Sequence, residues 1–236
     1  MIEHNSDNIY FIGDTHELDF VDVLEHYKLK DFILIHVGDT GTGFSKFSVD
    51  QARVGFLQKY CNENNGQIFL IRGNHDDPKY FVENSPLSSS RVTFLPDYTY
   101  LKINGKVCLF VGGAISIDRQ DRMLGEDYWQ DEIFVLSDNY NELPQCDVLV
   151  THSSPLSCPP MDGLSRISGW FKNDPTLKEE LIKERLDIEK LYLHVNCAQL
   201  YYGHFHMTSS YYDHGCFHRC LDINEIVDVT RNFSNT

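Results

Sequence analysis

The stretch Ile68-Phe69-Leu70-Ile71-Arg72-Gly73-Asn74-His75-Asp76 guides the interpretation of the whole chain. Its first four residues are apolar and of strand length, which predicts a buried strand. Gly73 then permits a sharp turn, and an amide, an imidazole and a carboxylate follow at the exit of the strand. Because Asn, Asp and Gly are also common turn residues, this stretch alone is equally compatible with an ordinary turn.

Four other strand-like runs end in polar residues of the same kinds. These ends are Asp14-Thr15-His16, Gly38-Asp39, Thr151-His152 and Gly203-His204-Phe205-His206. In open α/β sheets, ligands gather outside the carboxyl ends of the strands. Carboxylate, amide and imidazole groups are also the ligands that divalent metals accept. Each motif alone is often a turn or a helix cap, but five of them, each at the end of a strand, predict a metal site.

Two of these motifs hold ligand types that are two residues apart. On an extended chain this spacing puts both side chains on one face. Asp14 with His16, and His204 with His206, could therefore each bind one metal or two adjacent metals. The other histidines lack this context and are expected to be surface or core residues: His4, His26, His36, His194, His214 and His218.

Segments with the hydrophobic periodicity of a helix lie between the first predicted strands. Leu18, Val21 and Leu24 predict a first helix, a second is expected over about Asp50 to Asn64, and another begins near Pro175. Strands that alternate with helices in this way predict βαβ units and a parallel core.

The later part of the chain predicts antiparallel pairs. Asn104-Gly105 stands between two strand-like runs and is a strong hairpin signal. Two further runs, near Ser209 to Tyr212 and Phe217 to Ile223, predict an antiparallel edge. We find no repeat and no linker, so residues 1–236 are expected to form a single domain.

Composition and charge indicate a folded protein and argue against some classes of binding partner. Hydrophobic residues make up 42% of the 236 residues, which fits a folded chain. A formal charge of −15 argues against a broad nucleic-acid or anionic-membrane surface. It still allows a small phosphate-containing substrate, because a bound cation inverts the local field. The seven cysteines form no CxxC motif and are expected to be reduced thiols, several of them buried.

The sequence carries no membrane or secretion signal. No apolar run approaches the roughly 20 residues that cross a bilayer. The first residues lack the basic start and the apolar core of a secretory signal. A cytoplasmic location is therefore the expectation, while the oligomeric state is not indicated.

Taken together, the five motifs resemble the signature of the calcineurin-like metallophosphoesterases. That signature runs Asp-x-His, Gly-Asp, Gly-Asn-His-(Asp/Glu), a lone His and Gly-His-x-His, and here it spans Asp14 to His206 in the same order. The resemblance implies an α/β fold, a four-layer α-β-β-α sandwich with two central mixed sheets. The Gly112-Gly113-Ala114 block and the loop after it look like small bacterial or phage members of this superfamily.

The resemblance also implies a ligand set for two divalent metal ions. Asp39 would bridge the two ions with its carboxylate. The ligands of the first metal would be Asp14, His16 and His206, and those of the second would be Asn74, His152 and His204. Such ligands suit Mn²⁺, our first expectation, and also Fe, Zn or Ni.

The expected chemistry is hydrolysis of a small phosphomonoester or phosphodiester. Two cations about 3.5–4 Å apart clamp the phosphate and acidify a water, and the hydroxide attacks phosphorus in line. His75 resembles the histidine that stabilises the transition state or protonates the leaving group in this family. A hydrogen-bonding role behind the ligands is the alternative for His75. Arg119 and Arg122, in the polar loop 116–132, are candidate phosphate-binding residues.

Two other functions remain open. Ser/Thr protein phosphatases of this superfamily carry Gly-Asp-x-x-Asp-Arg-Gly, whereas the stretch from Gly38 to Gly43 lacks the second Asp and the Arg. Arg72, directly before Gly73, resembles the residue of those phosphatases at this position, but one residue is little support for that function. A metal-binding scaffold without catalysis is the third possibility, although every signature position is present. Asp76 is expected either to cap a helix at Pro78 or to support His75.

Overall fold

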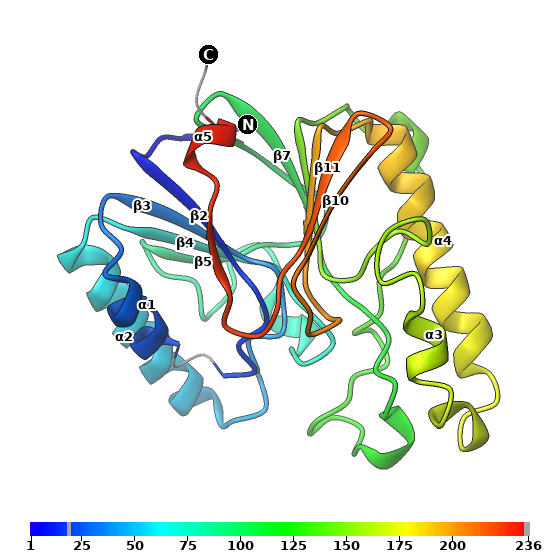
Figure 1. Cartoon of the computed structure of the whole chain (residues 1–236). Helices are drawn as coiled ribbons and strands as arrows, with labels where there is room; N and C mark the ends of the chain where they lie inside the picture. Colours follow the sequence, from blue (N-terminus) through cyan, green and yellow to red (C-terminus); the bar gives the residue numbers. More distant parts are fainter. Residues whose placement is uncertain (18–19, 234–236) are drawn as a thin grey trace.

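Two β-sheets lie face to face in the computed structural model, which describes residues 1–17 and 20–233 (Figure 1). The smaller sheet has the strand order β12-β2-β3-β4-β5. Strands β2 to β5 are parallel, and β12 pairs with β2 in the antiparallel sense. The bounds are β2 (Asn8–Ile12), β3 (Phe32–His36), β4 (Gln67–Leu70), β5 (Val92–Phe94) and β12 (Ile226–Asp228).

The larger sheet has the strand order β1-β6-β7-β8-β9-β11-β10. Its centre, from β7 to β9, is parallel, while the β6–β7 and β10–β11 pairs are antiparallel. The bounds are β1 (Glu3–His4), β6 (Thr99–Ile103), β7 (Lys106–Val111), β8 (Val148–Thr151), β9 (Gln199–Tyr202), β10 (Ser209–Asp213) and β11 (Cys216–Cys220). Both sheets are therefore mixed, as the family resemblance implied.

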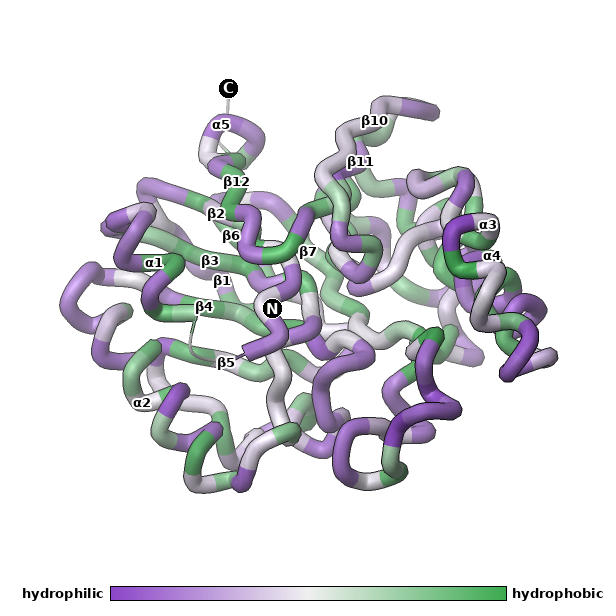
Figure 2. Tube along the Cα trace, turned by 60° about the horizontal axis from the view of Figure 1, so that its bottom comes forward, coloured by the Kyte–Doolittle hydropathy of each residue, from purple (hydrophilic) through white to green (hydrophobic). Residues whose placement is uncertain are grey.

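Successive side chains of a strand point alternately to the two faces of its sheet, and those that face the other sheet form the core between the sheets. In β3, Ile33 and Ile35 face the other sheet, whereas Leu34 faces the helices. Phe11 of β2 stacks on Tyr201 of β9 with 3.9 Å between ring centroids. Figure 2 shows the hydrophobic residues following the central strands β2 to β4. Burial of both faces explains why these runs read as almost continuously apolar in the sequence.

Helices cover the outer faces of the two sheets (Figure 1). Helices α1 (Val21–Tyr27) and α2 (Phe47–Glu63) pack on the smaller sheet, and α4 (Leu177–Val195) packs on the larger one. Two short helices, α3 (Gly163–Arg166) and α5 (Thr230–Phe233), complete the fold, with 3₁₀ turns at Pro78–Tyr80, Arg119–Asp121, Tyr140–Glu142 and Trp170–Lys172. The four-layer α-β-β-α sandwich is thus confirmed.

Several local predictions are also confirmed. Asn104-Gly105 joins β6 to β7, and β10 pairs with β11 at the edge of the larger sheet. All seven cysteines are buried free thiols. Leu18, which was predicted to belong to the first helix, lies outside the described residues.

Other elements differ from prediction. Helix α2 begins at Phe47, before the expected start near Asp50. The sequence patterns also missed β12, a three-residue strand that carries the chain back to the edge of the smaller sheet. No helix among residues 1–17 and 20–233 is both long and apolar enough to cross a membrane.

One carboxylate interrupts the apolar face of α4. Glu184 belongs to the stripe that includes Leu177, Leu181, Ile188 and Leu191, and only 5% of its surface is exposed. Its side chain has no hydrogen-bond partner of normal geometry in the described part of the chain. Burial raises the pKa of Glu184 to about 8, although the N–H of Phe134 partly offsets this effect.

Replacing Glu184 by glutamine should stabilise the protein in a pH-dependent way. The pKa of Glu184 in the folded chain lies above its usual value of 4.5, so stability is lost as pH rises from that value towards about 8. Glu184→Gln should therefore raise the free energy of unfolding by about 2 kcal/mol or more at pH 8, and by little at pH 4. Urea denaturation at both pH values measures this difference.

Glu179→Gln is the matched control, because Glu179 lies on the exposed side of the same helix. It should change stability by less than about 0.5 kcal/mol at either pH. An equal effect of Glu184→Gln at both pH values would contradict the assignment of a protonated carboxyl in the core.

Candidate metal centre

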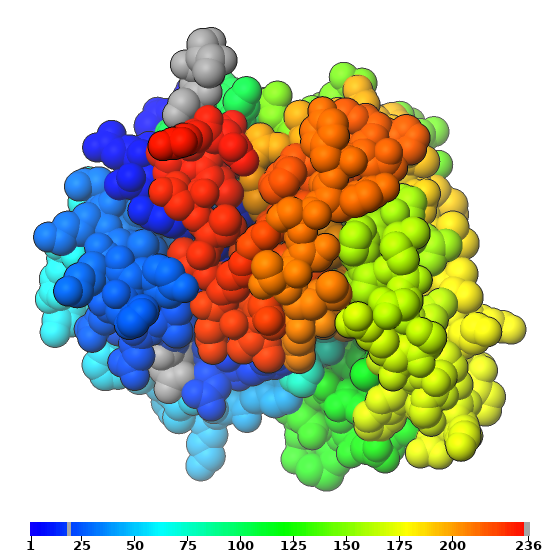
Figure 3. Space-filling view, in the orientation of Figure 1, coloured from blue at the N-terminus to red at the C-terminus, as the bar shows by residue number. Residues whose placement is uncertain are grey.

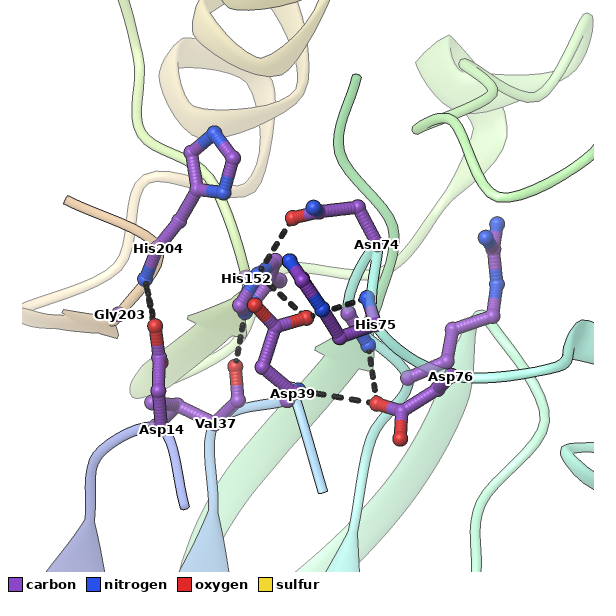
Figure 4. Close-up of polar contacts among 12 residues, drawn as sticks. Asp14, Val37, Asp39, Asn74, His75, Asp76, His152, Gly203 and His204 are labelled. Carbon is purple, nitrogen blue, oxygen red and sulfur yellow. Dashed lines mark hydrogen bonds and ion pairs between the residues drawn. The ribbon is translucent and has the colours of Figure 1, made fainter. Parts of the chain in front are cut away.

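Five strand exits meet at one edge of the two sheets. Strands β2, β3 and β4 run parallel, as do β8 and β9, so the carboxyl ends within each sheet point the same way. The residues after these strands converge in Figure 4, where Asp39 lies among side chains from both sheets. The structure therefore brings together motifs that lie about 190 residues apart in the sequence.

The side chains form two groups that share one carboxylate. Ligand atoms of the first group lie within 4.8 Å of one another, as do those of the second. Asp39 belongs to both groups. The first also contains Asp14, His16 and His206, and the second contains His152 and His204. Asn74 joins the second group, because its Oδ1 lies 3.2 Å from Nε2 of His152.

Hydrogen bonds to neighbouring residues orient these ligand side chains. Nδ1 of His152 donates to the carbonyl oxygen of Val37 at 2.8 Å, which turns Nε2 of the same ring towards Asp39. The backbone N–H of His204 donates to both oxygens of Asp14, at 3.1 and 3.0 Å. Such outer contacts orient ligands before a metal arrives.

Backbone strain concentrates at the same residues. Four of the seven candidate ligands have a positive φ: +56° at His16, +60° at Asp39, +67° at His204 and +47° at His206. A left-handed conformation costs a non-glycine residue about 1–2 kcal/mol. Such strain persists only where the surrounding structure holds it, and it is typical of functional sites.

Gly73 is required by the close approach of two strand exits. A Cβ atom at this position would lie 2.0 Å from Oδ1 of Asp39 and 2.4 Å from its backbone nitrogen. Only glycine allows the exit of β4 to reach the shared carboxylate.

The electrostatics of the site favour a cation. Asp14 and Asp39 are buried, with 0% and 1% of their surface exposed. Burial alone would raise the pKa of Asp39, but the neighbouring His152 holds it well below its usual value. Burial conversely opposes the charge on His152, yet Asp39 raises the pKa of that imidazole to about 10. A proton on His152 thus balances the buried carboxylate, and divalent metal binding would displace it.

Asp76 has neither of its two predicted roles. Asp77 caps the 3₁₀ turn at Pro78–Tyr80 by accepting from the N–H of Lys79. The buried carboxylate of Asp76 instead accepts from the loop that presents the shared ligand. Its donors are the backbone N–H groups of Asp39, Thr40, Thr42 and Gly73 and the hydroxyl of Thr40.

A buried chain of polar groups supports Asn74. The amide nitrogen of Asn74 donates to the Ser116 hydroxyl at 3.0 Å, which leaves the amide oxygen facing His152. Ser116 in turn donates its hydroxyl and its backbone N–H to the carboxylate of Glu132. Glu132 is fully buried, and this burial raises its pKa to about 7. Sequence patterns contain no signal for Ser116 or Glu132, because both lie in the irregular loop 116–132.

His75 contacts an arginine as well as the ligand His16, whose ring lies edge-on at 4.7 Å between centroids. Nε2 of His75 accepts from Nη2 of Arg122 at 2.6 Å, and the His75 ring stacks on Phe44 with 5.6 Å between centroids. Burial, together with the charge of Arg122, lowers the pKa of His75 to about 4 despite the opposing effect of Asp39. Arg122 is held in turn by Asp118 at 2.8 Å. In this arrangement the His75 ring is neutral and fixed in position.

Arg119 is not brought to the site, which corrects the expectation that it binds phosphate. Its guanidinium lies 2.6 Å from Asp174 and also pairs with Glu180 of α4. Both carboxylates compete directly with any phosphate, so Arg119 ties the loop 116–132 to α4. Arg122, three residues later, is the arginine of this loop that lines the cavity beside Asp39 and Asn74.

Comparison with known proteins identifies a matching family and solved structures of similar fold. The family model of calcineurin-like phosphoesterases matches residues 8–207. A crystal structure with 12% sequence identity covers 96% of each chain with a TM-score of 0.56. At that identity the likeness shows the fold alone.

Two further solved structures are similar at lower TM-score. Phosphopantetheinyl hydrolase of Mycobacterium tuberculosis has 12% identity and a TM-score of 0.45, covering 93% of this chain and 91% of that one. The protein TT1561 of Thermus thermophilus has the same identity and TM-score, covering 95% and 96%. No sequence among the curated proteins matches this chain.

Asp76→Asn should weaken both the fold and the metal centre. Both carboxylate oxygens of Asp76 accept hydrogen bonds from loop N–H groups. In Asn one of these oxygens is replaced by an NH₂ group, which cannot accept, so several buried hydrogen bonds are lost. We expect a loss of about 2–4 kcal/mol in the free energy of unfolding. Metal affinity should fall as well, because Asp39 moves with the loop. Denaturation and titration calorimetry measure the two effects.

Asp77→Asn is the matched control for this variant. Asp77 is the next residue and is also buried, but Asn caps a helical turn about as well as Asp. It should leave metal affinity unchanged. Equal metal affinity in Asp76→Asn and the wild type would show that Asp76 does not hold the ligand loop.

Ser116→Ala should weaken one metal position selectively. Without the hydroxyl, Asn74 loses the partner that aims its oxygen, and outer-shell changes of this kind typically cost about 10–100-fold in metal affinity. The position formed by Asp14, His16 and His206 should keep its affinity and serves as the internal control. A two-site manganese titration measures both, and parallel changes at the two positions would contradict the proposed role of Ser116.

Proposed function

Since this chain belongs to the calcineurin-like phosphoesterase family, we propose that it is a dinuclear metal-dependent hydrolase of small phosphomonoesters or phosphodiesters. The observation that carries the proposal is the position of Asp39, whose carboxylate belongs to both ligand groups. One shared carboxylate between two sets of nitrogen and oxygen ligands is the arrangement expected of a two-metal site.

The donor set supports two divalent cations, with Mn²⁺ as our first choice and Fe, Zn or Ni as alternatives. Asp14, His16 and His206 would hold one ion, and Asn74, His152 and His204 the other, with Asp39 between them. When bound, the two cations would supply Lewis acidity towards the phosphate and towards the attacking water.

His75 and Arg122 supply the remaining chemistry of the proposal. Both line the cavity beside Asp39 and Asn74, and their contact at 2.6 Å makes them one unit. A phosphate that draws the guanidinium of Arg122 towards itself would release Nε2 of His75. The freed Nε2 could then take up the proton that the attacking water loses and pass it to the leaving-group oxygen, which assigns leaving-group assistance to His75.

The two alternative functions have less support. Arg72, the residue that echoed protein phosphatases, forms an ion pair with Asp97 and donates to backbone carbonyl groups of residues 131–133. The Arg72 side chain therefore stabilises the fold and does not line the cavity. A scaffold without catalysis would need no His75–Arg122 pair beside the ligands. Both observations favour hydrolysis of a small ester.

The test is hydrolysis of mono- and bis-(p-nitrophenyl) phosphate after reconstitution with Mn²⁺, Fe²⁺, Zn²⁺ or Ni²⁺. At least one ester should be hydrolysed, and a chelator should abolish the activity. Asp39→Asn should lose both metal and activity. His75→Ala should lower kcat by about 10²–10⁴-fold while metal content stays at the wild-type level. His214→Ala is the control, because His214 is exposed at the β10–β11 turn.

Each failure has a distinct meaning. A wild-type protein that binds no metal would overturn the proposal. A protein that binds two ions yet hydrolyses neither ester with any metal would favour the scaffold. Activity on a phosphopeptide alone would favour the protein phosphatase.

A further inference from the structure

A cavity of about 340 Å³ opens directly from the candidate metal centre. One end is formed by ligand residues and by the residues of the proposed leaving-group unit: Asp39, Asn74, His204, His206, His75 and Arg122. Its volume lies in the lower part of the range of about 300–1,000 Å³ that is typical of small-molecule sites. The cavity is therefore large enough to take more of a substrate than its phosphate.

The other end of the cavity is mostly apolar. Besides Ser153, Pro160, Gly163, Arg166 and Arg185, its wall contains six large apolar side chains: Ile117, Leu164, Ile167, Trp170, Leu181 and Phe205. Of these, Leu181 is buried, and the other five remain partly exposed. Apolar side chains that line a cavity and stay in contact with water are a feature of ligand sites. Filling this end with an apolar group would remove their surface from water.

Two segments that are distant in sequence contribute most of this wall, and Leu181 of α4 and Phe205 after β9 complete it. Ile117 comes from the loop 116–132, while Leu164, Ile167 and Trp170 come from residues 163–170 around α3. These side chains pack together around Ile115, Leu177 and Leu181 in a small cluster of their own. Figure 3 shows the green loop beside the yellow-green segment on one face of the molecule. The wall is thus a supported surface and not an isolated pair of side chains.

The arginines at the cavity already have partners. Arg185 is buried and donates to Ser154 and to backbone carbonyl groups of residues 154–160. Arg166 is paired with Asp162 at 3.0 Å, and Arg122 lies with Asp118 and His75 at the metal end. Among the described residues, each of these cations is thus already held by other groups. A charged group placed at the apolar end would lose its hydration and would have to compete for these cations with their present partners.

We propose that the apolar end seats the alcohol part of the substrate, and that this alcohol is uncharged and carries a ring-sized apolar group. The inference rests on the proposed function and specifies its substrate class. Trp170 is the residue that sets this preference, because it is the largest side chain of the wall. Sugar phosphates with a second phosphate, and phosphopeptides with acidic neighbours, are poor fits to the same end.

The test compares three monoesters whose alcohols have similar intrinsic reactivity: 2-phenylethyl phosphate, ethyl phosphate and 2-(4-carboxyphenyl)ethyl phosphate. If the enzyme acts on diesters, the corresponding methyl diesters are used. The phenylethyl ester should have a kcat/KM at least about tenfold above that of the ethyl ester, in line with the discrimination that apolar pockets achieve. The carboxylate on the same ring should remove most of this advantage.

Trp170→Ala should lower the phenylethyl-to-ethyl ratio by about fivefold or more, and Ile167→Ala provides a second, milder change in the same wall. Tyr212→Ala is the matched aromatic control, because Tyr212 is 70% exposed on β10 and away from the cavity. Its ratio should equal that of the wild type. The ratio is insensitive to loss of metal or of folded protein, which would affect both esters alike.

Binding supplies a readout that does not depend on turnover. Calorimetry of the manganese-loaded protein with 2-phenylethylphosphonate and ethylphosphonate should show the same preference, and Trp170→Ala should reduce it. Equal binding of the two phosphonates, or an unchanged ratio in Trp170→Ala, would overturn the inference. Hydrolysis of both esters without any preference would overturn this inference and leave the proposed function intact. Absence of all hydrolysis would overturn the proposed function.

Discussion

The carboxylate of Asp76 is the contact on which the metal centre depends. It accepts from the backbone N–H groups of Asp39, Thr40 and Thr42, and so ties the exit of β3 to the exit of β4. The tie is reciprocal, because the backbone N–H of His75 donates to Asp39 Oδ1 at 2.7 Å. Two adjacent strand ends thus hold each other in place, and the shared ligand is fixed between them.

The rest of the site follows from the same constraint. Once the strand ends are fixed, residues such as His204 and Asp39 can hold a left-handed backbone that would otherwise be unfavourable. The second sheet then contributes His152 and His204, whose orientation is set by Val37 and Asp14 of the first sheet. The ligands therefore cross the interface between the sheets, and the packing of that interface is part of the site.

Sequence alone anticipated the parts of this protein that are encoded locally. Each ligand motif directly follows an apolar run, so the strand exits could be predicted, whereas the four-layer sandwich was implied only by the family resemblance. The role of Asp76 could not, because its partners lie about 35 residues earlier on another strand. Arg119 and Arg122 are chemically identical in the sequence, and only the folded position of their loop decides that one meets Asp174, just before α4, and the other meets His75. The apolar wall of the cavity likewise combines segments that are distant in sequence.

The central claim is that Asp39 bridges two metal ions, and anomalous diffraction from crystals grown with Mn²⁺ tests it most directly. We predict two anomalous peaks about 3.5–4 Å apart, with a carboxylate oxygen of Asp39 in contact with both. The remaining contacts should come from Asp14, His16 and His206 at one peak and from Asn74, His152 and His204 at the other. A single peak, or two peaks that do not share Asp39, would contradict the account.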